Sequence, residues 1–312
     1  MGCYLDVSKI TKQLSLIANE VIIMIHQHTQ QFGGKWTEEK LNIFTEYLNA
    51  YLIALQNQKF RKVYIDAFAG TGEIVTCDGG QRLVGSAKRA LSVDLKFDRY
   101  CFIEKDKKKV AELRKMIEDN FPKLVDRVSI FCGDANERIR EIISQIDWRF
   151  FRGLLFLDPC ATEVNWSSLE IIAKSKSIDM WYLFPFSALN RMLTKDGNMN
   201  STWAACIDRL LGDTNWRTEF YKEDPQLSLF DFGLEGSSNN RLVKDANIEH
   251  IKEYIIGRLE TIFPCVSKYP RIFRNKNNSP LFLFCFAISN DSDKAQRLAL
   301  KIANHILKPK QI

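Results

Sequence analysis

The hydrophobic and polar positions of the chain follow two alternating periods along most of its length. Short apolar runs predict strands near 63–65, 99–103, 128–132, 153–157 and 179–184. Between these runs, apolar residues recur every three or four positions, which predicts helices near 86–95, 106–119, 136–146 and 167–174. Strands that alternate with helices pair in parallel through right-handed crossovers. The pattern therefore predicts an α/β fold around a mostly parallel sheet.

The two ends of the chain add further elements to this core. Helical periodicity over 6–30 and 37–57 predicts that residues 1–60 form a helical extension packed on a core of residues 61–312. Near the C-terminus we expect a helix over 247–263, a strand near 266–273, a strand over 281–288 and a helix over 292–307. The two strands suit an antiparallel hairpin at the sheet edge. The stretch 212–246 is rich in Gly, Asp, Ser and Asn, and we expect an insertion there.

Composition excludes several classes of protein. The chain has 312 residues, of which 46% are hydrophobic and 26% charged, and these proportions are typical of a globular protein. No apolar run reaches the roughly 18 residues that span a bilayer, and no export signal opens the chain, so we expect a cytoplasmic protein with no membrane contact. The eight cysteines form no C-x-x-C pair, and the four histidines have no ligand spacing. We therefore expect free thiols and no metal site.

The first candidate for chemistry is the segment 64–72, in which an apolar strand ends at Asp66 and a turn with Phe68, Gly70 and Gly72 follows. Glycines let a backbone approach a ligand closely, and open α/β sheets bind cofactors beyond the carboxyl ends of their strands. The turn has no Gly-Lys-Ser/Thr for phosphate, and its acidic residues would repel a pyrophosphate. A cationic cofactor such as S-adenosylmethionine suits it better. The alternative is a tight strand–helix turn without a ligand.

Acidic residues also follow the next two strands. Glu104 ends the strand near 99–103, where a carboxylate can accept hydrogen bonds from both ribose hydroxyls of the cofactor. Asp134 follows the strand over 128–132 and could accept the adenine amino group. Each residue has a simpler interpretation, because an acidic side chain favours a helix N-terminus and Asp134 could cap the next helix.

The fourth acidic residue is Asp158, followed by Pro159 at the end of the strand near 153–157. The Asp158 carboxylate and the Pro159 carbonyl can accept the two hydrogens of an exocyclic amino group, which would aim the nitrogen lone pair at an electrophilic methyl group. We therefore take both as candidate catalytic residues. The alternative is an Asp-Pro turn that merely ends the strand.

The sequence indicates less clearly which residues would contact the substrate. Amino-methyltransferases usually follow Asp-Pro with proline and an aromatic residue that stacks on the target base, whereas this chain has Cys160-Ala161. Stacking is then expected from other aromatic residues, namely Phe184, Phe186 or Trp166. Lys35, Trp36 and Lys40 precede or open a helix near the site and could cover the cofactor. Lys35 and Trp36 are also candidates for substrate contact. The alternative is that these residues simply begin a surface helix.

Taken together, these motifs resemble the three-Cys-motif partner proteins. The matching segments are 35–51, 64–72, 85–87, 102–104, 157–159, Trp166, 179–185 and 280–282. The resemblance implies a methyltransferase-like fold, a bacterial or phage setting and a three-Cys-motif radical-SAM-like protein as partner. The segment 66–72 is also similar to ribosomal-RNA adenine-N6 methyltransferases.

We therefore expect a Rossmann-like class I methyltransferase fold with a mostly parallel seven-stranded sheet. The expected function is S-adenosylmethionine-dependent methylation of an amino group on a nucleic-acid or nucleotide base. Two alternatives stay open: a non-catalytic binding partner with the same fold, and a methyltransferase for a small molecule or protein. The segment Gln226-Leu227-Ser228-Leu229-Phe230 matches the peptide by which replication proteins hold a sliding clamp, or else pins the insertion to the core.

Overall fold

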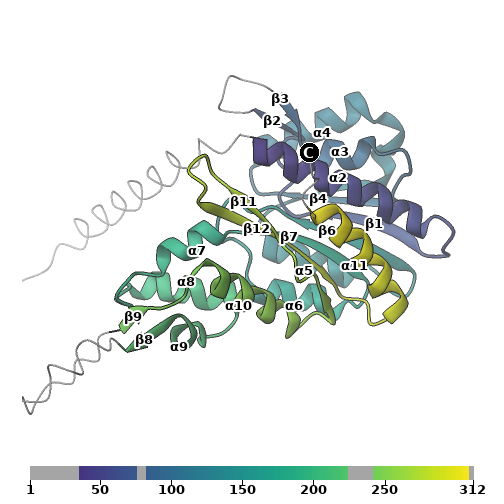
Figure 1. Ribbon diagram of the computed structural model, residues 1–312. Coiled ribbons are helices and arrows are strands. Elements are labelled where there is room, and N and C mark those ends of the chain that lie inside the picture. The colour runs from purple at the N-terminus through teal and green to yellow at the C-terminus, as the bar shows by residue number, and fades with distance from the viewer. Residues whose placement is uncertain (1–34, 76–81, 224–241, 309–312) are drawn as a thin grey trace, which may run out of the picture.

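The computed structural model describes residues 35–75, 82–223 and 242–308. The helix expected over 6–30 and the clamp-like segment 226–230 lie outside these residues, so both remain predictions. Figure 1 shows one large sheet at the centre of the molecule, with helices on both of its faces.

The central sheet has the strand order β10-β12-β7-β6-β1-β4-β5, and β11 pairs with β12 beside this path. Five strands run parallel to one another: β1 (Arg61–Asp66), β4 (Arg99–Glu104), β5 (Val128–Cys132), β6 (Phe151–Leu157) and β7 (Ile178–Phe184). The antiparallel strands are β10 (Cys265–Val266), β11 (Arg271–Arg274) and β12 (Pro280–Ile288).

The sheet has eight strands, one more than the sequence predicts. The strand expected near 266–273 divides into β10 and β11, and both pair with β12. Pro270 lies in the break, where a residue without a backbone N–H interrupts the hydrogen bonding. The expected mostly parallel sheet is confirmed, and the strand order with β12 antiparallel to β7 gives the Rossmann-like class I methyltransferase fold.

Two groups of helices cover the two faces of the sheet. The first face packs against α2 (Lys35–Leu55), α3 (Ser86–Ser92), α4 (Lys107–Asn120) and α11 (Asp293–Leu307). The second face packs against α5 (Ala135–Gln145), α6 (Trp166–Lys174), α7 (Phe186–Met192), α8 (Ser201–Leu211), α9 (Trp216–Phe220) and α10 (Ile248–Glu260). A 3₁₀ helix, η1 (Pro122–Arg127), precedes β5.

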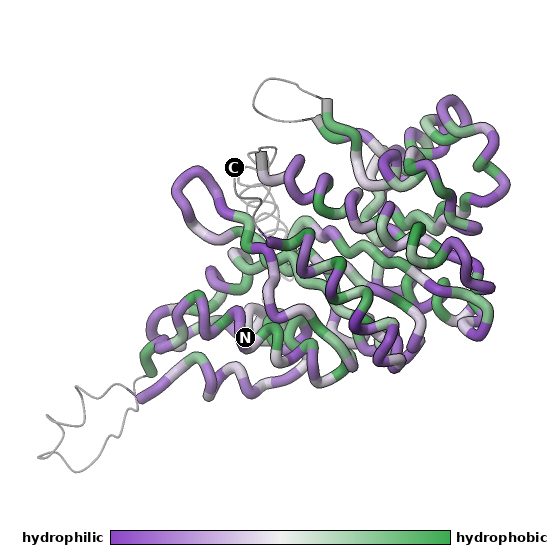
Figure 2. The backbone as a smooth tube through the Cα atoms, turned by 45° about the vertical axis from the view of Figure 1, so that its right-hand side comes forward, coloured by the Kyte–Doolittle hydropathy of each residue, from purple (hydrophilic) through white to green (hydrophobic). Residues whose placement is uncertain are grey.

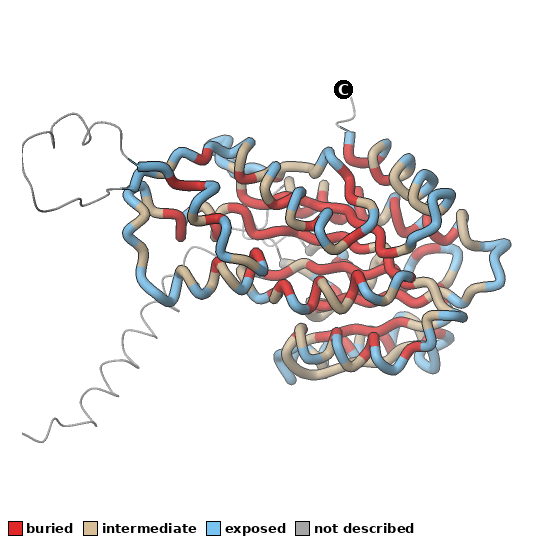
Figure 3. The backbone as a smooth tube through the Cα atoms, turned by 90° about the horizontal axis from the view of Figure 1, so that it is seen from below, coloured by how far each residue is buried: buried red, intermediate tan, exposed pale blue. Residues whose placement is uncertain are grey.

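Side-chain alternation along the strands creates two hydrophobic cores. In β1, Val63 and Ile65 face the second group of helices, whereas Tyr64 faces the first. Figure 3 shows that buried residues run along the strands, and Figure 2 shows helices that alternate between hydrophobic and hydrophilic positions. The strands β6 and β7 are mostly apolar along their length because helices cover both faces of the sheet there.

Two short hairpins lie apart from the central sheet, and the hydrophobic pattern did not predict them. The first joins β2 (Glu73–Val75) to β3 (Arg82–Val84), and the second joins β8 (Tyr221–Glu223) to β9 (Leu242–Lys244). The second hairpin falls within the expected insertion at 212–246. No helix within the described residues is both long and apolar enough to cross a membrane.

Gly212 and Gly257 offer a matched test of the packing on the second face. Gly212 ends α8 at φ +72°, and an added Cβ would lie 2.1 Å from the Trp166 ring. We expect Gly212→Ala to lower the free energy of unfolding by about 2–4 kcal/mol, because the backbone torsion and the ring both exclude the methyl group. Gly257 lies exposed in α10 with open space around it, so Gly257→Ala should add about 0.5–1 kcal/mol. Urea denaturation measures both, and similar values for the two variants would contradict the packing described.

Candidate functional site

The carboxyl ends of β1, β4, β5 and β6 meet at one edge of the sheet. Asp66 is the last residue of β1, and its backbone lies opposite Phe102 of β4 and Phe156 of β6. Glu104, Asp134 and Asp158 follow or end the other three strands. Parallel pairing therefore brings all four predicted acidic residues to the same edge, where open α/β sheets form their ligand crevice.

Glu104 ties the glycine turn to the start of α4. One carboxylate oxygen accepts a hydrogen bond from the Gly70 N–H at 3.0 Å, and the other accepts from the Asp106 N–H at 2.8 Å. A carboxylate offers about four lone-pair positions, so two acceptor positions remain on the half-buried Glu104. This side chain can therefore accept two hydroxyl groups without releasing the turn.

The glycine turn itself requires a left-handed backbone at two positions. Gly70 has φ +59° and Gly72 has φ +84°, torsions that residues with a Cβ rarely adopt. At Gly72 an added Cβ would lie 2.5 Å from the Met116 methyl group, whereas at Gly70 it would meet open space. The backbone at Gly70 is thus accessible to a ligand, while that at Gly72 is closely packed. Phe68, in the same turn, is partly buried against the core.

Asp66 has no exposed surface in the structure. Its carboxylate accepts hydrogen bonds from the Tyr64 hydroxyl at 3.0 Å and from the Phe68 N–H at 3.2 Å. Burial raises the pKa of Asp66 to about 6, although hydrogen bonds from Ser86, Phe68 and Tyr64 oppose this shift. Asp66 therefore shapes the turn from within, and a direct cofactor contact would require it to move.

Asp134 caps the N-terminus of α5, as its simpler interpretation predicts. Its Oδ1 accepts hydrogen bonds from the backbone N–H groups of Asn136 and Glu137, at 2.9 and 3.4 Å. Within the described part of the chain its Oδ2 has no hydrogen-bond partner, so capping and adenine recognition are compatible uses of one carboxylate.

Asp158 forms an ion pair that the sequence did not predict. The Lys40 ammonium group reaches from α2 and donates to Oδ2 of Asp158. The Lys40 side chain is only 4% exposed, and that of Asp158 is 19% exposed. The Trp36 ring lies 5.4 Å from the same ammonium group. Lys40 and Asp158 are 118 residues apart, so no local pattern in the sequence links them.

The first turn of α2 is fixed against the β11–β12 hairpin. Trp36 stacks on Phe282 with ring centroids 5.1 Å apart, and Glu39 forms a salt bridge with Arg271. These contacts hold Lys40 over the end of β6. Lys35 begins the helix, but its side chain lies outside the described part of the structure.

The loop after Asp158 is anchored to α8 on its far side. Pro159 is buried, and the exposed Cys160 follows it. Partial desolvation raises the pKa of the Cys160 thiol, so this cysteine is not an activated thiolate. Thr162 lies 3.2 Å from the Cys206 sulfur of α8, which holds the loop in place.

The two aromatic residues expected to stack on a substrate lie in the core. Phe184 and Phe186 are 2% and 0% exposed, and Phe184 makes an edge contact with Tyr182. Trp166 is also buried, beneath the Arg258 guanidinium group. Each ring is used for packing between the sheet and the helices of the second face, so none presents a stacking surface in this structure.

Comparison with known proteins gives distant structural similarities. No family model and no curated protein matches the chain. A Legionella pneumophila protein of the family DUF519 has 11% identity and a TM-score of 0.43, over 86% of this chain and 92% of that one.

Two further solved structures are similar to the same degree. Spermidine synthase from Thermotoga maritima has 14% identity and a TM-score of 0.39, over 82% of this chain and 59% of that one. A putative rRNA methylase from Clostridium thermocellum has 13% identity and a TM-score of 0.33, over 77% of this chain and 94% of that one. At such scores the fold assignment rests on the strand order of this chain.

The Lys40–Asp158 pair can be tested by a double-mutant cycle. We expect Lys40→Met to lower the free energy of unfolding by about 2 kcal/mol, because it leaves the Asp158 carboxylate without its partner. The double variant with Asp158→Asn should cost at least 1 kcal/mol less than the sum of the single variants. Lys88→Met removes the more exposed pair with Glu73 and should cost less than about 1 kcal/mol. Additive costs for Lys40 and Asp158 in urea denaturation would mean that the two charges do not interact.

Proposed function

We propose that the chain is an S-adenosylmethionine-dependent methyltransferase that modifies an amino group on a nucleic-acid base. The observation that supports this most strongly is the row of strand-end carboxylates beside an open glycine turn. Glu104 keeps two acceptor positions next to Gly70, and Asp134 keeps one oxygen. The hydroxyl and amino hydrogens of an adenosyl group are donors, so the residues present fit this cofactor.

The cofactor supplies an electrophilic methyl group on a positively charged sulfur. The protein contributes orientation and exclusion of water, which are the main sources of rate in a transfer that reduces charge. Oδ1 of Asp158 and the Pro159 carbonyl are the two acceptors that would hold the amino hydrogens of the substrate. Lys40 fixes the Asp158 carboxylate through Oδ2 and leaves Oδ1 for the substrate.

Lys40 also favours one kind of amine over another. An aliphatic amine carries a positive charge at neutral pH and would be repelled by the Lys40 ammonium group beside Asp158. The exocyclic amino group of a nucleobase is neutral and can share the carboxylate with Lys40. The buried lysine thus supports a base as substrate over a polyamine or a lysine side chain.

The charge near the crevice supports an anionic substrate. The first turn of α4 contains Lys107, Lys108 and Lys109 and begins three residues after Glu104. Lys109 acts electrostatically on Cys160, which places its charge near the loop after Asp158. Together with a net charge of +6, this turn suits contact with phosphate groups. The three-Cys-motif radical-SAM-like partner is proposed from the sequence resemblance alone.

A non-catalytic binding partner is the second candidate. It is favoured by the ion pair that occupies Asp158 and by Cys160-Ala161, which lacks the aromatic residue expected for stacking. The two candidates differ in a measurable way, because only the enzyme transfers a methyl group when cofactor, substrate and partner are all present.

Calorimetric titration with S-adenosylmethionine tests the cofactor. We expect micromolar binding, about −8 kcal/mol. Glu104→Ala should weaken it at least tenfold, because two acceptor positions are lost. Glu118→Ala, on the exposed side of α4, is the matched control and should bind as the wild type does. No binding by a folded wild-type protein, alone or with its partner, would remove the methyltransferase proposal.

Methyl uptake by RNA and DNA tests the catalytic residues. We expect Asp158→Ala to lower turnover by about 10²–10³ while cofactor affinity stays within twofold, since Asp158 contacts the acceptor and not the adenosyl group. Activity should also fall steeply with salt if the substrate is a nucleic acid. Turnover of the Asp158→Ala variant at the wild-type rate would exclude Asp158 from the mechanism. Cofactor binding without transfer to any acceptor would favour the non-catalytic partner.

A further inference from the structure

A cavity lies at the edge of the sheet opposite the candidate crevice. It has a volume of about 370 Å³ and lies between α2, α11 and the first residues of β6 and β7. Arg152 is the second residue of β6, whereas Asp158 follows its other end, and the six residue steps between them span about 20 Å. The cavity is therefore distinct from the candidate methyltransferase site and does not depend on it.

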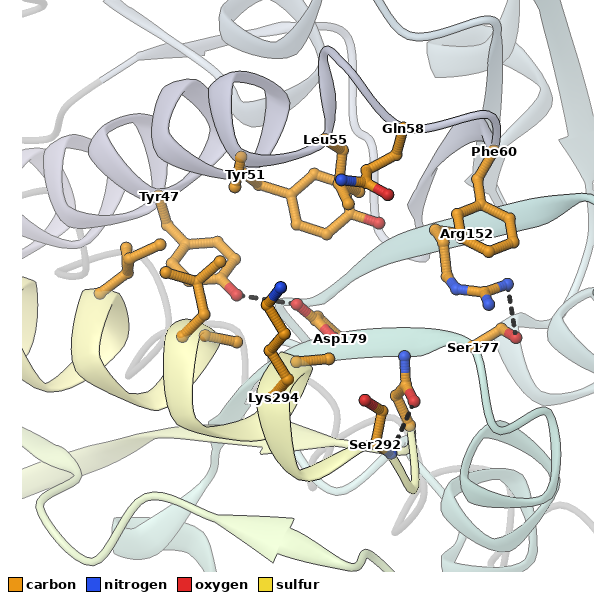
Figure 4. Close-up of a pocket in the computed structure, with 16 residues that line it drawn as sticks. Tyr47, Tyr51, Leu55, Gln58, Phe60, Arg152, Ser177, Asp179, Ser292 and Lys294 are labelled. Carbon is orange, nitrogen blue, oxygen red and sulfur yellow. Dashed lines mark hydrogen bonds between the residues drawn. The ribbon is translucent and has the colours of Figure 1, made fainter.

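Two opposite charges face this cavity without pairing with each other. Asp179 comes from β7 and Arg152 from β6, and Figure 4 shows both directed into the space beneath α2. Each affects the electrostatics of the other, yet within the described residues neither forms a salt bridge. Opposite charges attract each other more strongly where they are partly removed from water. Their separation across a cavity suggests that a ligand bridges them.

Each charge is held in place by its own neighbours. The Tyr47 hydroxyl donates to Oδ2 of Asp179 at 2.8 Å, which leaves Oδ1 as an acceptor. Nη1 of Arg152 donates to the backbone oxygens of Trp148 and Phe151 and to the Ser177 hydroxyl, at 3.1, 2.7 and 3.3 Å. Within the part of the chain described, Nε and Nη2 of Arg152 make no hydrogen bond, so they remain donors for an anion.

The orientation of Arg152 is fixed further by an aromatic ring. Its guanidinium carbon lies 3.6 Å from the centre of the Phe60 ring, so the planar group is stacked and cannot swing toward Asp179 without losing this contact. Lys294 adds a second positive charge from α11, and the Tyr51 hydroxyl adds a polar group from α2 (Figure 4). Asp179 and Arg152 thus place a carboxylate and a cation apart in one cavity, and Lys294 lies on the Asp179 side in Figure 4.

Gln58, Asn290 and Ser292 add polar groups to the lining, and the two helices supply an apolar part. The apolar part consists of side chains from the facing sides of the two helices, namely Ala54, Leu55, Ala295, Leu298, Ala299 and Ile302. An apolar wall beside a separated acid and base suits a molecule that has both charges at one end and a hydrocarbon group at the other. The volume lies at the lower end of the range for small-molecule sites.

We propose that this cavity binds a small zwitterion, a free α-amino acid with an apolar side chain. Asp179 and Tyr51 would take the ammonium group, and Arg152 would take the carboxylate. The side chain of the ligand would contact Leu55 and the apolar face of α11.

Calorimetry with L-leucine and two analogues that share its isobutyl group tests this proposal. Isoamylamine lacks the carboxylate and 4-methylpentanoate lacks the ammonium group, so each should bind at least tenfold more weakly than leucine. Asp179→Asn and Arg152→Gln should each weaken leucine binding at least tenfold. Arg149→Gln, which removes an exposed arginine just before β6, should leave it unchanged.

Several outcomes would overturn the proposal. Equal affinity for isoamylamine would indicate a cation site, and equal affinity for 4-methylpentanoate would indicate an anion site. Loss of leucine binding in Glu104→Ala with retention in Asp179→Asn would place the amino acid in the cofactor crevice instead. No heat with leucine, methionine or phenylalanine would exclude the ligand class. None of these results bears on methyl transfer, so the two proposals fail independently.

The pH dependence of leucine binding gives a further test. Burial raises the pKa of Asp179 to about 7, although the hydrogen bond from Tyr47 and the charge of Arg152 oppose this shift. An ammonium group requires the ionised carboxylate, so affinity should fall by about tenfold per pH unit well below pH 7 and level off above it. The other ionisable groups that face Asp179 are Tyr47, Tyr51, Arg152, Lys294 and Cys265. Asp179→Asn should remove the slope, and a slope that persists in this variant would assign it to another group.

Discussion

Parallel pairing of five strands is the constraint on which the rest of this molecule depends. Because β1, β4, β5, β6 and β7 share one direction, every residue that ends a strand meets the others at one edge. The same pairing collects the starts of the strands at the opposite edge. One sheet therefore positions both the candidate crevice and the cavity, and their chemistry differs because different residue types occupy its two edges.

The Lys40–Asp158 pair adds a second constraint, since it joins an element outside the sheet to the end of the central strand β6. A buried ion pair is weak support for stability, because both charges lose their hydration. Its value here is orientation: the carboxylate is held by one oxygen, and the other oxygen points to a defined place. The geometry of the crevice is thus set partly by α2, which precedes the sheet in the chain.

Local patterns predicted the five parallel strands and most of the helices, because burial of one face gives the sequence a regular hydrophobic period. They did not predict α7, α8 and α9, which also pack on the second face. They did predict that Asp66, Glu104, Asp134 and Asp158 end neighbouring strands. The pairing of Lys40 with Asp158, or the separation of Asp179 from Arg152, could not be predicted, since each depends on contacts between distant segments. Phe184 and Phe186 show the same limit of prediction from local sequence. The sequence places one aromatic residue at the end of a strand and one just after it, but tertiary packing decides that both face the core.

Helix α2 contacts both edges of the sheet, so its length fixes the distance between the residues that it contributes to the crevice and those that it contributes to the cavity. It has 21 residues, about 31 Å of rigid rod, with Lys40 near one end and Tyr47 and Tyr51 toward the other. Inserting a single residue between Lys40 and Tyr47 would rotate one end by about 100° relative to the other. Either the crevice or the cavity would then lose its contacts. Substitutions on the outer side of α2 are compatible with the fold, but a change in its length between these residues is not.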